Sequence, residues 1–279
     1  MTSRPSYICA ALVATKDRWE LLTQRALPSI RSQTLSPDLV VLVNDGRPIE
    51  EDRLLELPKI LGDIPIEIMP NKRSPGAAGA WNTGLRYLRN YGFDGYVAIL
   101  DDDDEWDKDH IALNMFQARE TGADLVVSGL RRVASGKAKP RMLPTGLQDS
   151  DFLRGNPGLQ GSNTFVSLSA LERAGDFTDG LPSMNDRDLA VRLLRSSIKV
   201  AYTKQWTATW HHGVERQTLS SPRSREKVLG LQWFWRRYSC EMNDEEIAAY
   251  LDRAFKCFGV TSEEVLDNWG IDGIGAKKM

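Results

Sequence analysis

Four consecutive aspartates follow a short apolar run, and they are the side chains in this sequence best suited to chemistry. Residues 96–100 have the composition of a buried strand, and Asp101, Asp102, Asp103 and Asp104 come directly after them. Adjacent carboxylates repel one another unless a cation or hydrogen-bond donors offset their charge. Alternate side chains of an extended segment share a face, so Asp101 and Asp103 would point the same way and share one Mg²⁺ or Mn²⁺ that bridges to a diphosphate. A solvated acidic loop is the competing interpretation.

The segments around this acidic run alternate between strand and helix patterns. Short apolar runs and amphipathic stretches follow one another from residue 7 to residue 128, which predicts βαβ units and a mainly parallel sheet covered on both faces. Ligands bind at the carboxyl ends of such strands. Three loops there begin with polar residues, at 44–46, 71–76 and 101–104, so we expect these groups to gather along one edge of the sheet.

The second half of the chain differs from the first in its residue composition. Residues 131–161 are rich in Gly, Pro and Lys, and we expect an extended surface segment or lid there. Further along, the pattern predicts helices at 168–174, 186–195, 223–238, 244–258 and 262–269, and a strand at 199–207.

Composition narrows the class of protein. Apolar residues make up 41% and charged residues 27% of 279 residues, which is ordinary for a folded globular chain. A net charge of -2 gives no general attraction for nucleic acid, so we expect no nucleic-acid partner. The three cysteines, Cys9, Cys240 and Cys257, are widely spaced, which predicts neither disulfides nor a zinc site and fits the cytoplasm. No run approaches the roughly 20 apolar residues of a membrane-spanning helix.

Several motifs, taken together, resemble those of family 2 glycosyltransferases of the GT-A fold. The matching segments, in chain order, are 15–18, 27–34, 43–46, 71–84 and 100–104. The last of them is similar to the family's D-x-D signature after an apolar strand. Two positions depart from the family pattern, because Arg47 replaces the usual Ser and Trp81 stands where Arg is common.

The resemblance covers roughly residues 6–220 and implies an α/β fold class. The expected architecture is GT-A, a Rossmann-like and mainly parallel central sheet flanked by helices, with a helical C-terminal extension. We therefore expect a catalytic domain at 1–220, with a nucleotide-binding half at 1–105 and an acceptor and catalytic half at 106–220. The helical extension would occupy 221–279.

The resemblance also implies a donor site for a nucleotide-diphosphate sugar. Asp45 would accept a hydrogen bond from the imide N–H of uracil or thymine, which favours a UDP- or dTDP-sugar, although Asn-Asp-Gly is also an ordinary turn. Arg73 would balance phosphate charge, and Gly79 would allow close packing of the next helix. The other implied donor-binding residues are Thr15, Asp17, Asp101 and Asp102, and the implied direct ligand of Mn²⁺ or Mg²⁺ is Asp103.

The catalytic role falls by resemblance on Asp186. In the family an acidic pair begins this helix and its Asp is the base; here Asn185 replaces the first acid. Inverting transfer requires a carboxylate that takes the proton of the acceptor hydroxyl. Capping of the helix is the simpler interpretation of this aspartate. Residues 158–165, with Gln160, Ser162 and Asn163, would line the sugar pocket or form a plain turn.

Histidines are the remaining metal candidates. In the family a His near Trp210 can complete the metal shell, so His211 and His212 are both candidates, and the sequence leaves open which one binds. Adjacent residues on a strand face opposite ways, and an arrangement in which neither binds metal is also open. His110, within the helix after the acidic run, is predicted to be a surface residue.

Other functions remain to be distinguished from glycosyl transfer. A haloacid-dehalogenase-like phosphatase also has Asp-x-Asp after a strand, but usually near the N-terminus. A sugar nucleotidyltransferase would need a Gly-rich loop after the first strand, which is missing. An EF-hand starting at Asp101 fails because Trp106 and Ala112 stand where Gly and Glu are required. A non-catalytic nucleotide-sugar-binding domain stays open.

The stretch at 223–238 combines basic and aromatic residues. Such a helix can rest on an anionic membrane, which would place the protein peripherally at the inner membrane face. Packing over the catalytic domain or against a homodimer partner is the favoured interpretation, because the apolar residues are few. The sequence does not identify the acceptor, whose hydroxyl would belong to a glycan, a lipid-linked molecule, a peptide or a small molecule.

Overall fold

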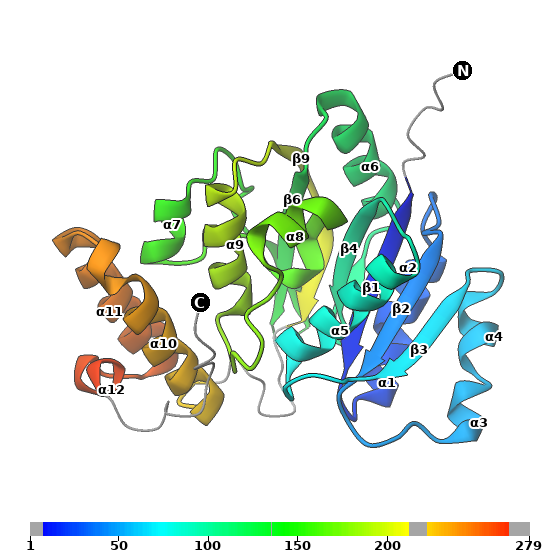
Figure 1. Ribbon diagram of the computed structural model, residues 1–279, viewed down its shortest axis with the longest axis horizontal. Coiled ribbons are helices and arrows are strands. Elements are labelled where there is room, and N and C mark those ends of the chain that lie inside the picture. Colours follow the sequence, from blue (N-terminus) through cyan, green and yellow to red (C-terminus); the bar gives the residue numbers. More distant parts are fainter. Residues whose placement is uncertain (1–7, 135, 212–221, 268–279) are drawn as a thin grey trace.

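The apolar runs of the first half form the parallel part of one sheet. The computed structural model describes residues 8–134, 136–211 and 222–267 (Figure 1). Strand β1 (Cys9–Thr15) lies between β2 (Leu39–Asn44) and β4 (Tyr96–Asp101), β3 (Ile66–Pro70) flanks β2, and all three pairings are parallel. All side chains of β2 are buried, as expected for a strand covered on both faces. The predicted α/β fold is confirmed.

The second half of the sheet is mixed rather than parallel. Strand β8 (Thr164–Ser167) is antiparallel to both β4 and β6 (Leu125–Ala134), and β6 runs parallel to β9 (Val200–His211). The short strand β5 (Glu105–Trp106) pairs with β9 and closes the order β3-β2-β1-β4-β8-β6-β9-β5 among the described residues.

The segment at 131–161 alternates short regular elements with irregular chain. Residues 131–133 of β6 pair with β9, and β7 (Lys137–Pro140) pairs antiparallel with β6. Helix α7 (Asp149–Arg154) follows, and a 3-10 turn, η2 (Gly161–Asn163), precedes β8. All residues of β7 are exposed, which agrees with the expected extended surface segment, while a role as a lid stays a prediction.

Helices cover both faces of the sheet. One face carries α1 (Trp19–Leu21), the π-helical η1 (Leu22–Ala26), α2 (Leu27–Arg31), α4 (Leu57–Leu61) and α6 (His110–Thr121). The other face carries α5 (Ala77–Asn90), α8 (Leu168–Ala174) and α9 (Asn185–Arg195). Alternate residues of β1 feed the two cores, since Ala10 and Leu12 join one and Ala11 and Val13 the other. The short helix α3 (Glu51–Leu54), like α4, was not predicted.

The C-terminal helices pack against α7 and α9, on the side of the molecule opposite β3 (Figure 1). They are α10 (Arg225–Tyr238), η3 (Ser239–Glu241), α11 (Asp244–Phe258) and α12 (Ser262–Leu266). Phe234 of α10 and Tyr250 of α11 belong to the same core as α5 and α9, which agrees with the packing interpretation of the aromatic helix. Membrane contact, a homodimer and the domain boundary at residue 220 stay predictions. Among the described residues, none of the helices has the length and apolarity needed to cross a bilayer.

Candidate active site

The four aspartates form a turn at the carboxyl end of β4. The backbone N–H of Asp104 donates to the carbonyl oxygen of Asp101 over 3.1 Å, so the segment is not extended beyond Asp101. Burial nevertheless alternates: Asp102 and Asp104 are 0% and 1% exposed, whereas Asp101 and Asp103 are half-buried. The run is thus divided into two inward carboxylates and two that border solvent.

Arg18 neutralises two of these carboxylates. Its guanidinium lies 2.5 Å from Oδ1 of Asp102 and 2.6 Å from Oδ2 of Asp103. The hydroxyl of Thr15 also donates to Asp102, over 2.7 Å. Burial raises the pKa of Asp102 to about 6 although Arg18 opposes this shift. Thr15 and Asp102 therefore form an internal contact that joins β1 to the acidic turn.

Ser162 joins the turn to η2 from the other side. Its hydroxyl lies 2.6 Å from Oδ2 of Asp104 and 3.5 Å from Oδ2 of Asp101. The backbone N–H of His211 donates to Oδ1 of Asp104 over 2.9 Å. Because both oxygens of Asp104 are used in this way, this aspartate anchors β9 and η2 to the end of β4.

Asp186 meets Asp101 at Gly161. The backbone N–H of Gly161 donates to the carboxylate of Asp186, and the Cβ position of Gly161 lies 3.5 Å from both carboxylate oxygens of Asp101. Burial raises the pKa of Asp101 well above its ordinary value, and the charges of Asp104, Asp103 and Asp186 raise it further. Burial likewise raises the pKa of Asp186 to about 6, against the opposing effect of Lys227.

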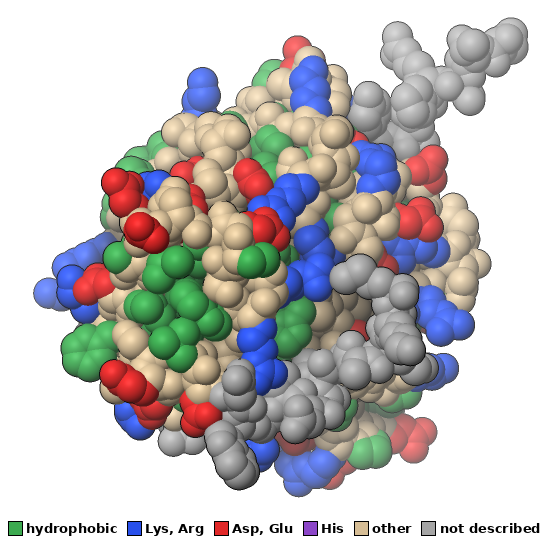
Figure 2. Space-filling model, turned by 60° about the vertical axis from the view of Figure 1, so that its left-hand side comes forward, with side chains coloured by type: hydrophobic (Ala, Val, Ile, Leu, Met, Phe, Trp, Pro, Cys, Tyr) green, Lys and Arg blue, Asp and Glu red, His purple; other side chains and the backbone are tan. Residues whose placement is uncertain are grey.

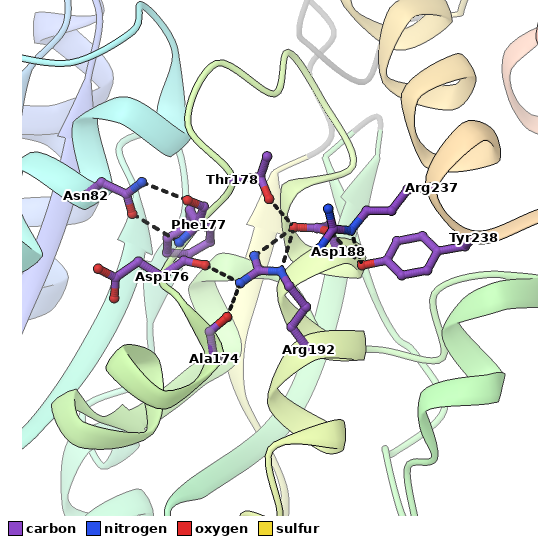
Figure 3. A network of polar contacts seen from close by, with 9 residues as sticks. All are labelled: Asn82, Ala174, Asp176, Phe177, Thr178, Asp188, Arg192, Arg237 and Tyr238. Atoms are coloured by element: carbon purple, nitrogen blue, oxygen red, sulfur yellow. Dashed lines mark hydrogen bonds and ion pairs between the residues drawn. The ribbon is translucent and has the colours of Figure 1, made fainter. Parts of the chain in front are cut away.

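A buried polar network holds the helix that carries Asp186 (Figure 3). Asp188 accepts hydrogen bonds of 2.7 Å from Thr178, Arg192 and Tyr238. On the neighbouring segment, Asn82 of α5 bonds the backbone of Phe177 twice, with its amide donating to the carbonyl over 2.8 Å and its oxygen accepting the N–H over 3.0 Å. Helices α5, α9 and α10 are thereby tied together, and Asp186 lies two residues before Asp188 in the first turn of α9.

The expected base-binding residue is already engaged. Oδ1 of Asp45 accepts from Asn71 over 2.6 Å and Oδ2 accepts from the backbone N–H of Gly76 over 2.8 Å, while Lys16 lies 3.4 Å away. Asp45 thus holds the loop after β3 against the loop after β2. Whether it also accepts a hydrogen bond from a nucleotide base stays a prediction.

Beside this contact, a pocket of about 280 Å³ opens at the ends of β1 and β2. Its lining includes Thr15, Asp17, Arg18 and the ring of Trp19. Asp17 adopts φ 52° and accepts from the backbone N–H of Arg47 over 3.1 Å, and this contact lowers the pKa of Asp17. The pocket combines charged groups with an aromatic ring at the sheet edge where the sequence predicts ligand binding.

Arg73 and Gly79 meet at a third loop. Arg73 lies 3.8 Å from Asp179, so in this structure it balances a carboxylate. A Cβ on Gly79 would lie 1.9 Å from the carbonyl oxygen of Ser74, which means that only glycine lets this loop pass over α5. The role of Gly79 visible here is the close packing of backbone.

The histidines occupy two different environments. Nε2 of His211 lies 2.9 Å from Oε1 of Glu105, while His212 lies outside the described residues. His110 is fully buried, stacks on Trp106 and contacts the hydroxyl of Thr207 over 2.8 Å, so the prediction of a surface residue was wrong. Burial lowers the pKa of His110 to about 3 and keeps it neutral. The helical pattern of α6 did not reveal that β9 covers its first turn.

Comparisons with known proteins identify the family of this chain. The family model described as glycosyl transferase family 2 matches residues 11–173, more than half of the 279 residues. The chain belongs to glycosyltransferase family 2. The predicted family and the predicted enzyme class, a glycosyltransferase, are confirmed. No curated protein matches this glycosyltransferase at a significant level.

Solved structures show the same fold as this glycosyltransferase. Residues 1–349 of S. aureus TarS, in complex with UDP-GlcNAc, are 15% identical with a TM-score of 0.63, and the match covers 88% of this chain and 79% of that one. The mannosyltransferase PcManGT from Pyrobaculum calidifontis, in complex with GDP-Man and Mn²⁺, is 16% identical with a TM-score of 0.57 and coverages of 90% and 70%. The predicted GT-A architecture is confirmed.

The residues of this glycosyltransferase offer oxygen ligands for a divalent cation. Asp101 and Asp103 border solvent among other carboxylates, and burial together with these neighbouring charges raises the pKa of Asp101. Carboxylate oxygens are the ligands that Mg²⁺ and Mn²⁺ prefer. Among the described residues no three His, Cys, Asp or Glu side chains are arranged to hold a metal ion. A cation here would therefore take further ligands from a diphosphate and water.

Sequence reasoning missed two members of the site. Arg18 was noted only as part of a motif. Its position in the loop after the first strand, at the same edge of the sheet as the acidic run, could have indicated that it pairs with these aspartates. Lys227 carried no local signal at all, because its relation to Asp186 depends on how α10 packs on α9.

Proposed function

We propose that this family 2 enzyme is an inverting, metal-dependent glycosyltransferase that moves a sugar from a nucleotide-diphosphate donor to an acceptor hydroxyl. Residues 1–220 would form the catalytic domain and residues 221–279 a helical extension. Within the first of these, residues 1–105 would bind the nucleotide and residues 106–220 would bind the acceptor.

The observation that carries the proposal is the meeting of Asp186 and Asp101 at Gly161. One carboxylate comes from the helix assigned to the acceptor side and the other from the strand assigned to the donor. Transfer requires these two carboxylates to lie close together, because the acceptor oxygen must approach the anomeric carbon while the diphosphate departs from the opposite face of that carbon.

Asp186 acts as the general base in this proposal. Its carboxylate takes the proton of the acceptor hydroxyl while the new bond forms between that oxygen and the anomeric carbon. The bond between the anomeric carbon and the diphosphate oxygen breaks, and its electron pair leaves with the diphosphate. A pKa of about 6 suits this role because the group is ionised near neutral pH yet more basic than an exposed aspartate.

Asp103 and Asp101 would hold the cation, either Mn²⁺ or Mg²⁺, with His211 or His212 as further candidates. A bound cation would supply charge stabilisation to the departing diphosphate. Arg18 already lies on Asp103 and is well placed to keep this carboxylate oriented. The contact of His211 with Glu105 favours the two aspartates over this histidine as the principal ligands.

For the donor, we favour a UDP- or dTDP-sugar. The pocket at the ends of β1 and β2 is of a size for a nucleoside fragment, and Asp45 borders the neighbouring loop. TarS binds UDP-GlcNAc and PcManGT binds GDP-Man, so the two structural relatives differ in base. Thermal-shift measurements with UDP, dTDP and GDP, each with and without Mn²⁺, would identify the base by the largest stabilisation.

The test of the function is turnover of the donor. Release of nucleoside diphosphate by the wild-type protein, lost in Asp186→Asn and retained in Asp244→Asn, is the expected result. Asp244 is exposed in the first turn of α11, so it matches the chemical change and the helix position without touching the site. Binding of a nucleotide sugar without any turnover would instead indicate a non-catalytic binding domain. Release of inorganic phosphate from small phosphoesters would indicate a phosphatase.

A further inference from the structure

Four cations gather near the candidate base, and among the described residues only one of them, Lys227, interacts with an acid there, Asp186. We call Arg132, Arg141, Lys227 and Arg253 the basic cluster; they belong to β6, to the residue after β7, to α10 and to α11. None of them forms an ion pair within the part of the chain that the structure describes. This differs from the next residue along β6, Arg131, which forms an ion pair of 2.9 Å.

Arg141 and Arg253 flank the same loop, because the carbonyl oxygen of Met142, the residue after Arg141, lies 3.8 Å from the Cβ position of Gly158, and Cδ of Arg253 lies 3.5 Å from that of Gly155. Burial lowers the pKa of Arg141, and the charges of Arg253 and Arg132 lower it further. Burial also lowers the pKa of Lys227 to about 8; the charges of Arg187 and Arg253 lower it further, and the charge of Asp186 opposes this shift. Such repulsion is an electrostatic cost to the folded protein, which an opposite charge from outside would remove.

The cluster begins beside the candidate base. Lys227 is 6% exposed and exerts a favourable charge interaction on Asp186. Arg253 lies along the loop that leads to Gly161, since its Cδ is 3.5 Å and its Nε 3.7 Å from the Cβ position of Gly155. Gly161, at the other end of this loop, donates the hydrogen bond to Asp186.

From there the cluster extends to the surface. Arg141 and Arg253 are half-buried and Arg132 is exposed, with its guanidinium 5.3 Å from the centre of the Trp210 ring. On the face that carries the C-terminal helices, Lys and Arg side chains form a row beside an apolar patch (Figure 2). Helices α10 and α11, which carry Lys227 and Arg253, lie far from β1 and β2, where the donor pocket is (Figure 1). A donor diphosphate at Asp101 and Asp103 would leave these outer cations unused.

We infer that the basic cluster binds the acceptor, and that the acceptor carries oxyanion groups, phosphate or carboxylate, alongside the hydroxyl that receives the sugar. This inference rests on the proposed glycosyltransferase function. Arginine is suited to such groups because its planar fork donates two parallel hydrogen bonds to a phosphate or carboxylate. Because the four cations lie on or beside four different elements, they are better suited to binding several anionic groups along one acceptor molecule than to binding a single anionic group. The protein as a whole has a net charge of -2, so the positive surface is a local property.

The test separates anion binding from catalysis. The variant Arg132→Gln/Arg141→Gln/Arg253→Gln leaves Asp186 and Lys227 in place. Binding of inorganic polyphosphate, measured by isothermal titration calorimetry, should weaken at least about 10-fold in this variant and become less salt-dependent. The matched control is Lys59→Gln/Lys108→Gln/Lys199→Gln, which removes three exposed charges elsewhere and should change the affinity less than about 2-fold.

Transfer assays then identify the chemistry of the acceptor. The wild type is compared on a neutral oligosaccharide, an oligogalacturonate and an oligo(glycerol phosphate), with hydrolysis of the donor alone as the reference. The inference predicts a lower KM for one of the two anionic acceptors, a rise of about 10-fold in that KM in the cluster variant, and an unchanged KM for the donor. The preferred anion tells phosphate from carboxylate.

Two results would overturn the inference while the glycosyltransferase function stands. One is equal use of neutral and anionic acceptors by both proteins. The other is a rise in the KM of the donor instead of the acceptor, which would assign the cluster to the diphosphate. If the wild type neither binds nor turns over any nucleotide sugar, the proposed function fails, and polyphosphate binding then reports an anion site without that function.

Discussion

The hydroxyl of Tyr238 on α10 donates a hydrogen bond of 2.7 Å to Oδ1 of Asp188 on α9, and both side chains are buried. Asp188 lies two residues after the candidate base, in the same first helical turn. The contact therefore couples the packing of the C-terminal helices to the position of Asp186. It also separates the roles of two aspartates that look equivalent in the sequence, because Asp188 is an anchor and Asp186 borders the site.

The first prediction concerns this anchor. Tyr238→Phe removes the hydroxyl donor and leaves a buried carboxylate oxygen without it, so the free energy of unfolding should fall by about 1–3 kcal/mol. Urea denaturation of the purified protein would measure this. Tyr91→Phe is the control, because Tyr91 is 68% exposed and its hydroxyl should contribute little. Equal stability of the two variants would show that the contact does not anchor the helices.

The second prediction separates activity from stability at Asp186. Asp186→Asn should lower kcat by about 10²–10⁴-fold, the usual contribution of a general base. The same variant should be more stable than the wild type at pH 7.5 by about 3 kcal/mol, because burial raises the pKa of the carboxylate from 3.8 to about 6 and one pKa unit corresponds to about 1.4 kcal/mol. Thermal melting and turnover of one protein preparation test both. A variant that is inactive and clearly less stable would contradict the interpretation of Asp186 as a catalytic carboxylate whose charged form destabilises the folded protein.

The third prediction is the pH dependence of transfer. The base works only when ionised, and its pKa is about 6, so kcat should rise with pH and level off above roughly pH 7. Stability should change in the opposite sense. The folded-state pKa lies above the ordinary value of 3.8, so the contribution of the protonated group is present below about pH 4 and is lost as the pH rises through 6. A pH–rate profile without an acid limb between pH 5 and 7 would exclude Asp186 as the titrating base.

The fourth prediction distinguishes two aspartates of the acidic turn. Asp103→Asn should abolish the increase in nucleotide affinity that Mn²⁺ produces, with a change of less than about 1 kcal/mol in stability, because Asp103 borders solvent. Asp104→Ala should instead destabilise the protein by about 2–4 kcal/mol, because it leaves Ser162 and the backbone N–H of His211 without their acceptor. Nucleotide titrations with and without Mn²⁺, together with urea denaturation, would separate the two effects. The reverse pattern would move the metal ligand from Asp103 to Asp104.

Patterns of hydrophobic residues were sufficient to predict most of the elements. The strand at β2 and the helices α8 and α11 were predicted with their observed limits, because each has a clear period and punctuation by turn or capping residues. The acidic run was recognised for the same reason, as polar residues follow an apolar strand, but the run was taken as extended and its turn was not predicted. Short helices such as α3 and α4 were missed because four or five residues are too few to show a period.

Contacts between distant segments were decided only by the tertiary structure. The sequence around Asp188 does not indicate its contact with Tyr238. The sequence around Asp186 likewise does not indicate its contacts with Lys227 and Gly161, since each contact joins elements that are far apart in the chain. The same holds for Arg18, whose carboxylate partners lie more than eighty residues away. By itself the amino-acid sequence determined the α/β fold class, the acidic strand end and the resemblance to the family, because these depend on local pattern. The division of the acids into buried anchors and carboxylates that border solvent was decided by packing, because burial and the partners of each carboxylate exist only in the folded chain.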